Sequence, residues 1–69
     1  MYYQLKYGDL YLEEIDYEET TINKIIFNKE MGTALKDFDL ADEIRKIVFI
    51  ELGVELRIEK IKLFNKEDN

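Results

Sequence analysis

The sequence predicts a small α+β domain of the order β-β-β-α-β, in which a single helix packs on one face of a small, curled, mainly antiparallel sheet. Three observations carry this prediction. Alternating apolar and polar residues flank Gly8-Asp9, residues 40–52 show helical periodicity, and residues 54–59 alternate again. With 69 residues the chain suffices for one domain, which we expect to span residues 1–64 and to leave a frayed tail at 65–69.

The N-terminal residues predict a β-hairpin around Gly8 and Asp9. Glycine takes the positive φ that a type II′ turn requires at its first central position, so this pair suits a two-residue loop. Further along the second strand the apolar residues change from even-numbered positions (Leu10, Leu12) to odd-numbered ones (Ile15, Tyr17). A bulge or bend near Glu13 and Glu14 would account for this one-residue shift. In this register one side of the sheet carries Leu5, Tyr7, Leu10 and Leu12.

Residues 22–27 are rich in β-branched and aromatic side chains, which favours a third strand. The same residues also fit a helix, because Ile22, Ile25 and Ile26 recur at i, i+3 and i+4. Strand and helix are therefore both open here, and the strand is the one we expect. Residues 28–32 are expected to form a connection.

The strongest periodic element is a helix. Asp39 is its expected N-cap and Leu40 its first residue, which places Asp42 and Glu43 in the first turn, where the helix dipole favours negative charge. Gly53 is expected to close the helix in the left-handed conformation. The apolar stripe of this helix is Leu40, Ala41, Ile44, Ile47, Val48 and Leu52.

The last strand is predicted at residues 54–59, where apolar and charged side chains alternate. The apolar phase then slips, because Ile61 and Leu63 are odd-numbered. A bend near Glu59 and Lys60 would account for this slip.

The composition excludes most enzyme chemistry, because the chain contains no cysteine, histidine, serine, proline or tryptophan. Thiolate and serine nucleophiles, imidazole bases and Cys/His zinc sites are thereby absent. A magnesium-dependent nuclease built on Glu55, Glu59 and Lys60 is the enzyme alternative, but positions 55, 57 and 59 are better explained as the outer face of a strand. We therefore expect a non-enzymatic binding protein without a cofactor or a metal.

The charge balance favours a protein partner. Sixteen acidic and ten basic residues give a net charge of −6, and direct nucleic-acid binding is disfavoured because it needs clustered lysine and arginine. The longest apolar run, residues 47–50, is far shorter than the roughly 20 residues that a membrane-crossing helix needs. We expect a cytoplasmic protein whose partner has a basic surface.

Two acidic clusters are the main candidate binding residues. The first cluster is Glu13, Glu14, Asp16, Glu18 and Glu19. A solvated strand face or ligands for Mg²⁺ or Ca²⁺ are the alternative explanations for it. The second cluster surrounds the start of the helix and includes Asp37 and Asp39, with helix capping as the alternative explanation. Carboxylates spread across a surface can imitate a row of phosphates and compete for a groove lined by lysine and arginine.

All five tyrosines lie within the first 17 residues. Strand alternation places Tyr2 and Tyr11 on the face opposite Leu5 and Leu12, where exposed tyrosines beside carboxylates resemble a protein-binding surface. Cross-strand packing under partial burial is the alternative explanation.

The apolar pattern from residue 34 onward is carried by Ala34, Phe38, Ala41, Ile44, Leu52-Gly53 and the closing strand at 54–63. With the tyrosine-rich hairpin before it, this pattern resembles short proteins encoded by phages and prophages of low-GC Gram-positive bacteria. The resemblance implies a small accessory protein that binds and inhibits a host protein, in some cases as an acidic mimic of nucleic acid. It implies no functional residues.

A structural or assembly protein that self-associates is the alternative function. A core of this size without disulfides is marginal, and oligomerisation is a common remedy. A homodimer with twofold symmetry is the default, in which the first or the last strand could pair across the axis. Lys60 and Lys62, however, are typical of a guarded sheet edge.

Overall fold

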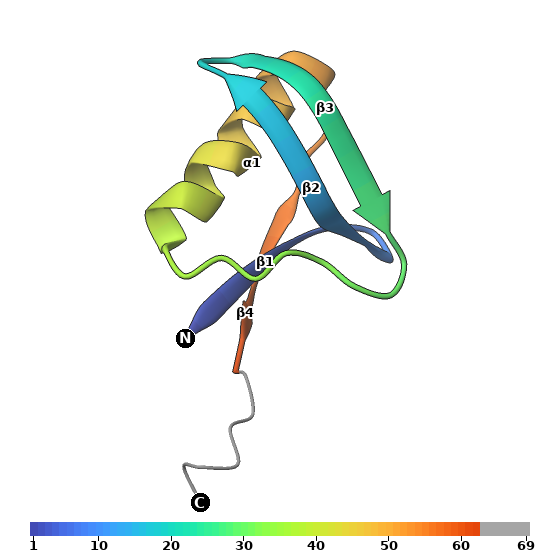
Figure 1. Ribbon diagram of the computed structural model, residues 1–69, viewed down its shortest axis with the longest axis vertical. Helices are drawn as coiled ribbons and strands as arrows, with labels where there is room; N and C mark the ends of the chain where they lie inside the picture. The colour runs from blue at the N-terminus through green and yellow to red at the C-terminus, as the bar shows by residue number, and fades with distance from the viewer. Residues whose placement is uncertain (63–69) are drawn as a thin grey trace, which may run out of the picture.

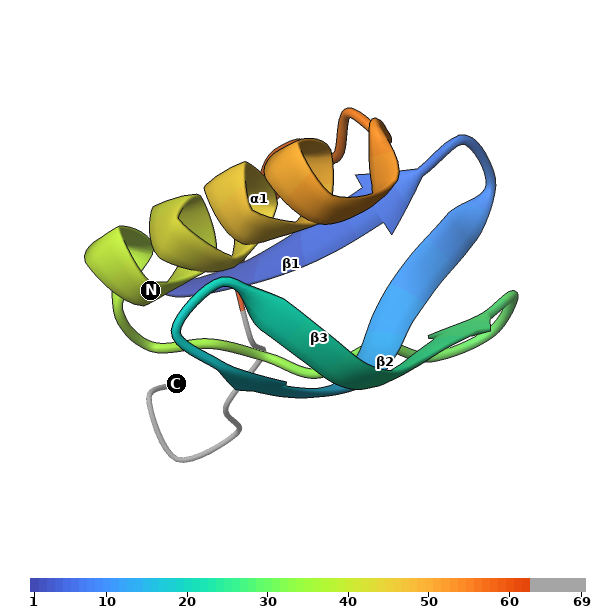
Figure 2. The ribbon, with the colours of Figure 1, turned by 90° about the horizontal axis from the view of Figure 1, so that it is seen from above.

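The computed structural model describes residues 1–62, which form four strands and one helix. The strands make one antiparallel sheet in the order β3-β2-β1-β4, and the helix lies on one face of this curled sheet (Figures 1 and 2). The α+β class and the β-β-β-α-β order are therefore confirmed, whereas Leu63 and the expected tail lie outside the described residues. The elements are β1 (Tyr2–Tyr7), β2 (Leu10–Glu18), β3 (Thr21–Asn28), α1 (Phe38–Leu52) and β4 (Arg57–Ile61).

The first hairpin has the predicted two-residue loop. Tyr7 pairs with Leu10, and Gly8 takes a φ of 60°. Leu5 and Leu12 are buried, as predicted, but Tyr7 is exposed and Leu10 is half-buried. The four side chains lie on one side of the sheet, as predicted, because Tyr7 is paired opposite Leu10 and its ring lies 6.5 Å from that of Phe27, which pairs with Leu12. β1 and β2 separate soon after the turn, however, and remain paired at two positions only.

The connection between β3 and α1 lies between the separating strands. The Tyr3 and Leu35 backbones exchange two hydrogen bonds of 2.8 Å, and the Thr33 N–H donates to the Leu12 carbonyl at 3.0 Å. Gly32 passes so close to β2 that a Cβ on it would lie 2.7 Å from the Cβ of Tyr11. This segment therefore replaces the missing β1–β2 hydrogen bonds, a role that the sequence does not indicate.

Residues 22–27 form a strand, and the helical alternative is excluded. The pairing of β2 with β3 shifts register twice. The first shift leaves Glu13 as an extra residue in β2, which confirms the predicted bulge. The second leaves Asn23 as an extra residue in β3, which was not predicted. Bulges bend a strand and increase its twist, so these two help to curl the ribbon over the helix.

The helix begins two residues earlier than predicted. Asp37, not Asp39, is the N-cap, and its carboxylate accepts a hydrogen bond of 2.9 Å from the Asp39 N–H. Phe38 is thereby the first helical residue, and its ring packs edge-on against Tyr3 with centroids 5.4 Å apart. That tertiary contact favours the earlier start, and it could not be read from the local pattern around Leu40.

The earlier start moves Asp42 and Glu43 out of the first turn, where Asp39 is the only acidic residue. The prediction that Gly53 closes the C-terminal end of the helix is confirmed. Gly53 has a φ of 68°, and its N–H donates to the Phe49 carbonyl at 2.9 Å.

The core lies between the helix and the sheet, and four residues of the predicted helical stripe belong to it. Leu52, in contrast, is exposed, so its assignment to the core is wrong, while Leu40 is partly exposed and lines the space between α1 and β2. Leu52 is the last helical residue, from which the chain leaves through Gly53. The buried side chains are Leu5, Leu12, Ala41, Ile44, Ile47, Val48 and Leu56.

The last strand starts later than predicted. β4 runs straight through Glu59 and Lys60, which pair with β1, so the predicted bend at these residues is wrong. Residues 54–56 instead link the helix to the strand. Because β1 lies inside the sheet, the first strand also cannot pair across a dimer axis, and β3 and β4 are the edges.

Candidate functional site

Most of the first acidic cluster lies on the face of β2 that is turned away from the helix. Glu14, Asp16 and Glu18 are exposed, while the residues between them turn towards the core. Lys24 on β3 stands opposite Asp16, and its Nζ lies 3.2 Å from the Glu14 carboxylate. The outer face is therefore not a continuous strip of negative charge, although no base occurs in the sequence from residue 7 to residue 23.

Glu13 has a structural role at the bulge. Its carboxylate accepts a hydrogen bond of 3.0 Å from the Asn28 amide, and its backbone carbonyl accepts one of 2.5 Å from the Thr33 hydroxyl. These contacts tie the bulge to the end of β3 and to the connection that follows. Half-buried and engaged in this way, Glu13 is less available to a partner than its exposed neighbours.

The β2–β3 turn brings the first acidic cluster to the helix. Figures 1 and 2 show this turn beside α1. Glu19 at the turn and Asp39 in the first helical turn line the same depression, which we call the acidic hollow. One residue of each sequence cluster thus lines the same depression, which extends along α1 from Asp39 to Ile50. The hollow is lined by Glu19, Thr20, Asp39, Asp42, Glu43, Lys46, Ile47 and Ile50.

Two of the four carboxylates in the hollow are engaged by neighbours. Asp42 contacts Arg45 at 2.6 Å and Lys46 at 3.3 Å, and hydrogen bonds from these cations hold the pKa of Asp42 below its ordinary value. The Tyr17 hydroxyl donates to the Glu43 carboxylate at 2.8 Å. Burial, and then this bond and the charge of Glu43, raise the pKa of Tyr17.

The other two carboxylates lie at the exposed rim of the hollow. Glu19 and Asp39 are both exposed, and Glu19 has a φ of 54°, in the left-handed region that normally favours glycine. Ile50, whose exposed fraction is 66%, lines the hollow about three helical turns beyond Asp39. The hollow therefore combines negative charge with an accessible apolar side chain.

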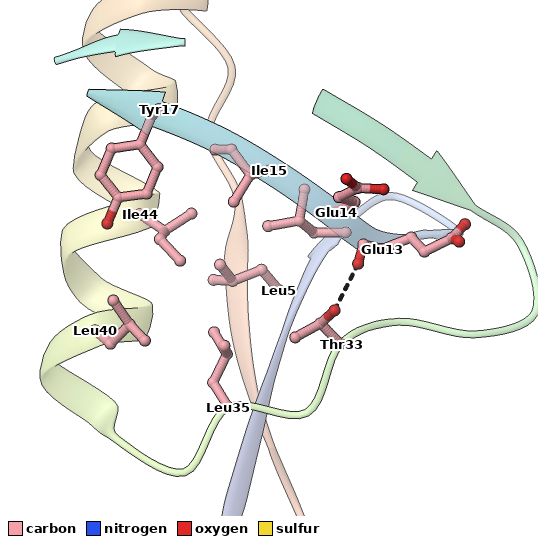
Figure 3. Close-up of a pocket in the computed structure, with 10 residues that line it drawn as sticks. Leu5, Glu13, Glu14, Ile15, Tyr17, Thr33, Leu35, Leu40 and Ile44 are labelled. Atoms are coloured by element: carbon pink, nitrogen blue, oxygen red, sulfur yellow. Dashed lines mark hydrogen bonds between the residues drawn. The ribbon is translucent and has the colours of Figure 1, made fainter. Parts of the chain in front are cut away.

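A second depression, the apolar groove, lies between β2 and α1 (Figure 3). Its volume is about 320 Å³, and its apolar side chains point inward while the carboxylates of Glu13 and Glu14 point away from them. Tyr17 joins the two depressions, because its ring lines the groove and its hydroxyl binds Glu43. The groove is lined by Leu5, Leu12, Glu13, Glu14, Ile15, Tyr17, Thr33, Leu35, Leu40 and Ile44.

Sequence reasoning missed this groove. It exists because β1 and β2 separate and leave a space beside the helix. No local pattern signals that separation, since Leu5 and Leu12 fit a fully paired hairpin equally well.

The remaining predicted site residues do not join the hollow. Tyr2 and Tyr11 are half-buried and lie by alternation on the outer face of the sheet, where the Lys6 ammonium sits 4.7 Å from the Tyr11 ring centroid. Asp37 is engaged as the helix cap. Of the predicted site residues, Glu19 and Asp39 thus line the hollow and the others do not.

Within residues 1–62 no group of three or more acidic side chains is arranged to hold a metal ion. No helix in that range is both long enough and apolar enough to cross a bilayer. Comparison with protein-family models, curated proteins and solved structures gave no match.

Proposed function

We propose that this protein is a non-enzymatic binding module and that the acidic hollow docks a basic surface of a protein partner. The observation that carries the proposal is a single hollow along α1 that is lined by Glu19 of one acidic cluster, Asp39 of the other, and the exposed Ile50. Fixed carboxylates of this kind attract lysine and arginine and increase the rate at which a basic partner associates.

The exposed Ile50 favours a protein as the partner. The aliphatic stems of lysine and arginine cover apolar surface while their charged ends reach nearby carboxylates. A metal ion or a small anion would gain no favourable contact from the apolar side chain of Ile50. A nucleic acid would be repelled by the net charge of −6.

The biological class that we propose is a phage or prophage accessory protein that acts in the bacterial cytoplasm and inhibits the host protein it binds. The carboxylates of the hollow would occupy cations that the host protein otherwise uses for phosphates, as a mimic of nucleic acid does. The resemblance of the apolar pattern and the acidic composition support this class.

Affinity capture from the lysate of a low-GC Gram-positive bacterium, with mass spectrometry, tests the proposal. The wild type should retain a basic protein at about 50 mM salt and lose most of it at about 200 mM, because exposed charges are screened. The hollow variant Glu19→Lys/Asp39→Lys should lose the protein at both concentrations.

The matched control reverses the same number of charges on the outer face, as Glu14→Lys/Asp16→Lys. It has the same net charge as the hollow variant and should retain the protein. Circular dichroism confirms that each variant is folded. Retention by the hollow variant, or equal retention at both salt concentrations, would contradict the proposal.

A further inference from the structure

β4 has an open edge with free hydrogen-bonding groups. Among residues 1–62, no strand pairs with the side of β4 that faces away from β1. Both backbone groups of Tyr3 bond to Leu35, so Tyr3 and its neighbour Lys60 form a pair without mutual hydrogen bonds. Because such pairs alternate in an antiparallel ladder, the N–H and C=O groups of Ile58 and Lys60 face the open edge.

We propose that this edge binds the β4 strand of a second copy of the chain, antiparallel and across a twofold axis, with Ile58 opposite the partner's Ile58. The two sheets then form one continuous sheet. The inference goes beyond the proposed function, because it concerns a different edge of the molecule.

Charge complementarity selects this register. Symmetric pairing places one residue opposite its own copy, and centring on Arg57, Glu59 or Lys60 puts like charges directly opposite each other. Centring on Ile61 places Lys60 opposite the partner's Lys62. Centring on Ile58 instead places Arg57 opposite the partner's Glu59, and Glu59 opposite the partner's Arg57. Of the five possible centres, residues 57 to 61, Ile58 is the one that places opposite charges against each other at positions 57 and 59.

The helix flank above this edge supplies apolar surface. Phe38 and Arg45 line a hollow together with Ile58, so this flank of α1 lies towards β4. Phe49 follows Arg45 by four residues and therefore shares the flank. The exposed fractions of Phe38 and Phe49 are 48% and 53%. In the proposed dimer the two flanks approach each other across the axis, which removes these rings from water.

The opposite edge of the sheet is less suited to pairing. β3 carries the Asn23 bulge, which interrupts the regular pattern of hydrogen bonds along the strand. The acidic hollow lies beside the β2–β3 turn and shares one lining residue, Asp42, with the hollow beside Ile58, while none of its other lining residues belongs to that hollow. The dimer therefore leaves both copies of the hollow accessible, and dimerisation and partner binding can fail independently.

Sedimentation equilibrium of the full chain, from about 1 to 500 µM, tests the proposal. The wild type should dimerise within this range. Arg57→Glu and Glu59→Arg should each weaken dimerisation at least about tenfold, because each places like charges opposite each other. The double swap Arg57→Glu/Glu59→Arg should restore it, and an equimolar mixture of the two single variants should form a heterodimer.

Lys29→Glu is the control for the change in net charge, because Lys29 is exposed in the β3–α1 connection. This variant should dimerise like the wild type, and circular dichroism verifies that all variants are folded. A wild type that stays monomeric throughout overturns the proposal. Single variants that dimerise normally, or a double swap that does not recover, overturn the register.

Discussion

Tyr17 is the residue that links the core to the acidic hollow, since its ring packs on the apolar groove and its hydroxyl binds Glu43. The folded protein holds the phenol in its neutral form, which raises its pKa. A raised pKa means that the unfolded chain loses the proton first. The associated stability is therefore fully present below the unfolded value near 10 and is lost as the pH rises through the folded value.

Tyr17→Phe should remove this dependence. Between about pH 9 and pH 11 the free energy of unfolding of the wild type should fall more steeply than that of the variant, because only the wild type has this phenol. Urea unfolding of both proteins across that range measures the difference. Parallel curves would show that the Tyr17–Glu43 bond does not bias the protonation of Tyr17.

Glu19 is the residue at which we expect function to conflict with stability. Its φ of 54° is unfavourable for a residue with a Cβ. Glu19→Gly should raise the free energy of unfolding by about 0.5–1 kcal/mol, since relief of the strain exceeds the added entropy of the unfolded chain.

The same substitution removes a rim carboxylate, so it should weaken partner capture while stabilising the fold. Thr20→Gly at the next position has no positive φ to relieve and should destabilise the protein. Thermal unfolding distinguishes the two variants. Equal effects at both positions would mean that the turn is not strained at Glu19.

At the scale of elements, the helix cap is the point where sequence and structure disagree most clearly. Asp37→Ala should lower the free energy of unfolding by about 1 kcal/mol, because the Asp39 N–H loses its acceptor. Asp39→Ala should have a smaller effect, since Asp39 lies in the first turn and interacts only with the helix dipole. Chemical denaturation of both variants measures this order, and the reverse order would place the helix start at Leu40.

Elements with local chemical signals could be predicted from the sequence. Gly8 and Gly53 take the positive φ values that the hairpin turn and the helix end require. The phase slip near Glu13 indicated the bulge in β2. The bulge at Asn23 and the late start of β4 could not be predicted, because they depend on partners distant in the sequence.

At the scale of the whole molecule, the fold depends on a small core around Val48, which is fully buried. Val48→Asp should unfold the domain, because it places an uncompensated charge among apolar side chains. Leu52→Asp, four residues on, should leave it folded, since Leu52 is 50% exposed. Circular dichroism separates the outcomes, and a folded Val48→Asp variant would contradict the assigned core.

The candidate site was predictable in its residues but not in its location. The acidic clusters are evident in the sequence, yet the hollow that both help to line depends on how the β2–β3 turn lies against the helix. The contribution of Lys24 to the outer face likewise follows from strand register. Residues 13–18 therefore lie outside the hollow, whereas Glu43 of the second acidic cluster lines it.

Carbodiimide cross-linking of the captured complex tests the central claim most directly, because it joins a carboxylate to a lysine only where the two are in contact. Peptide mapping should find the links to the partner at Glu19, Asp39 and Glu43, around the acidic hollow. Links confined to Glu14, Asp16 and other carboxylates of the outer face would contradict the claim that the hollow is the binding surface.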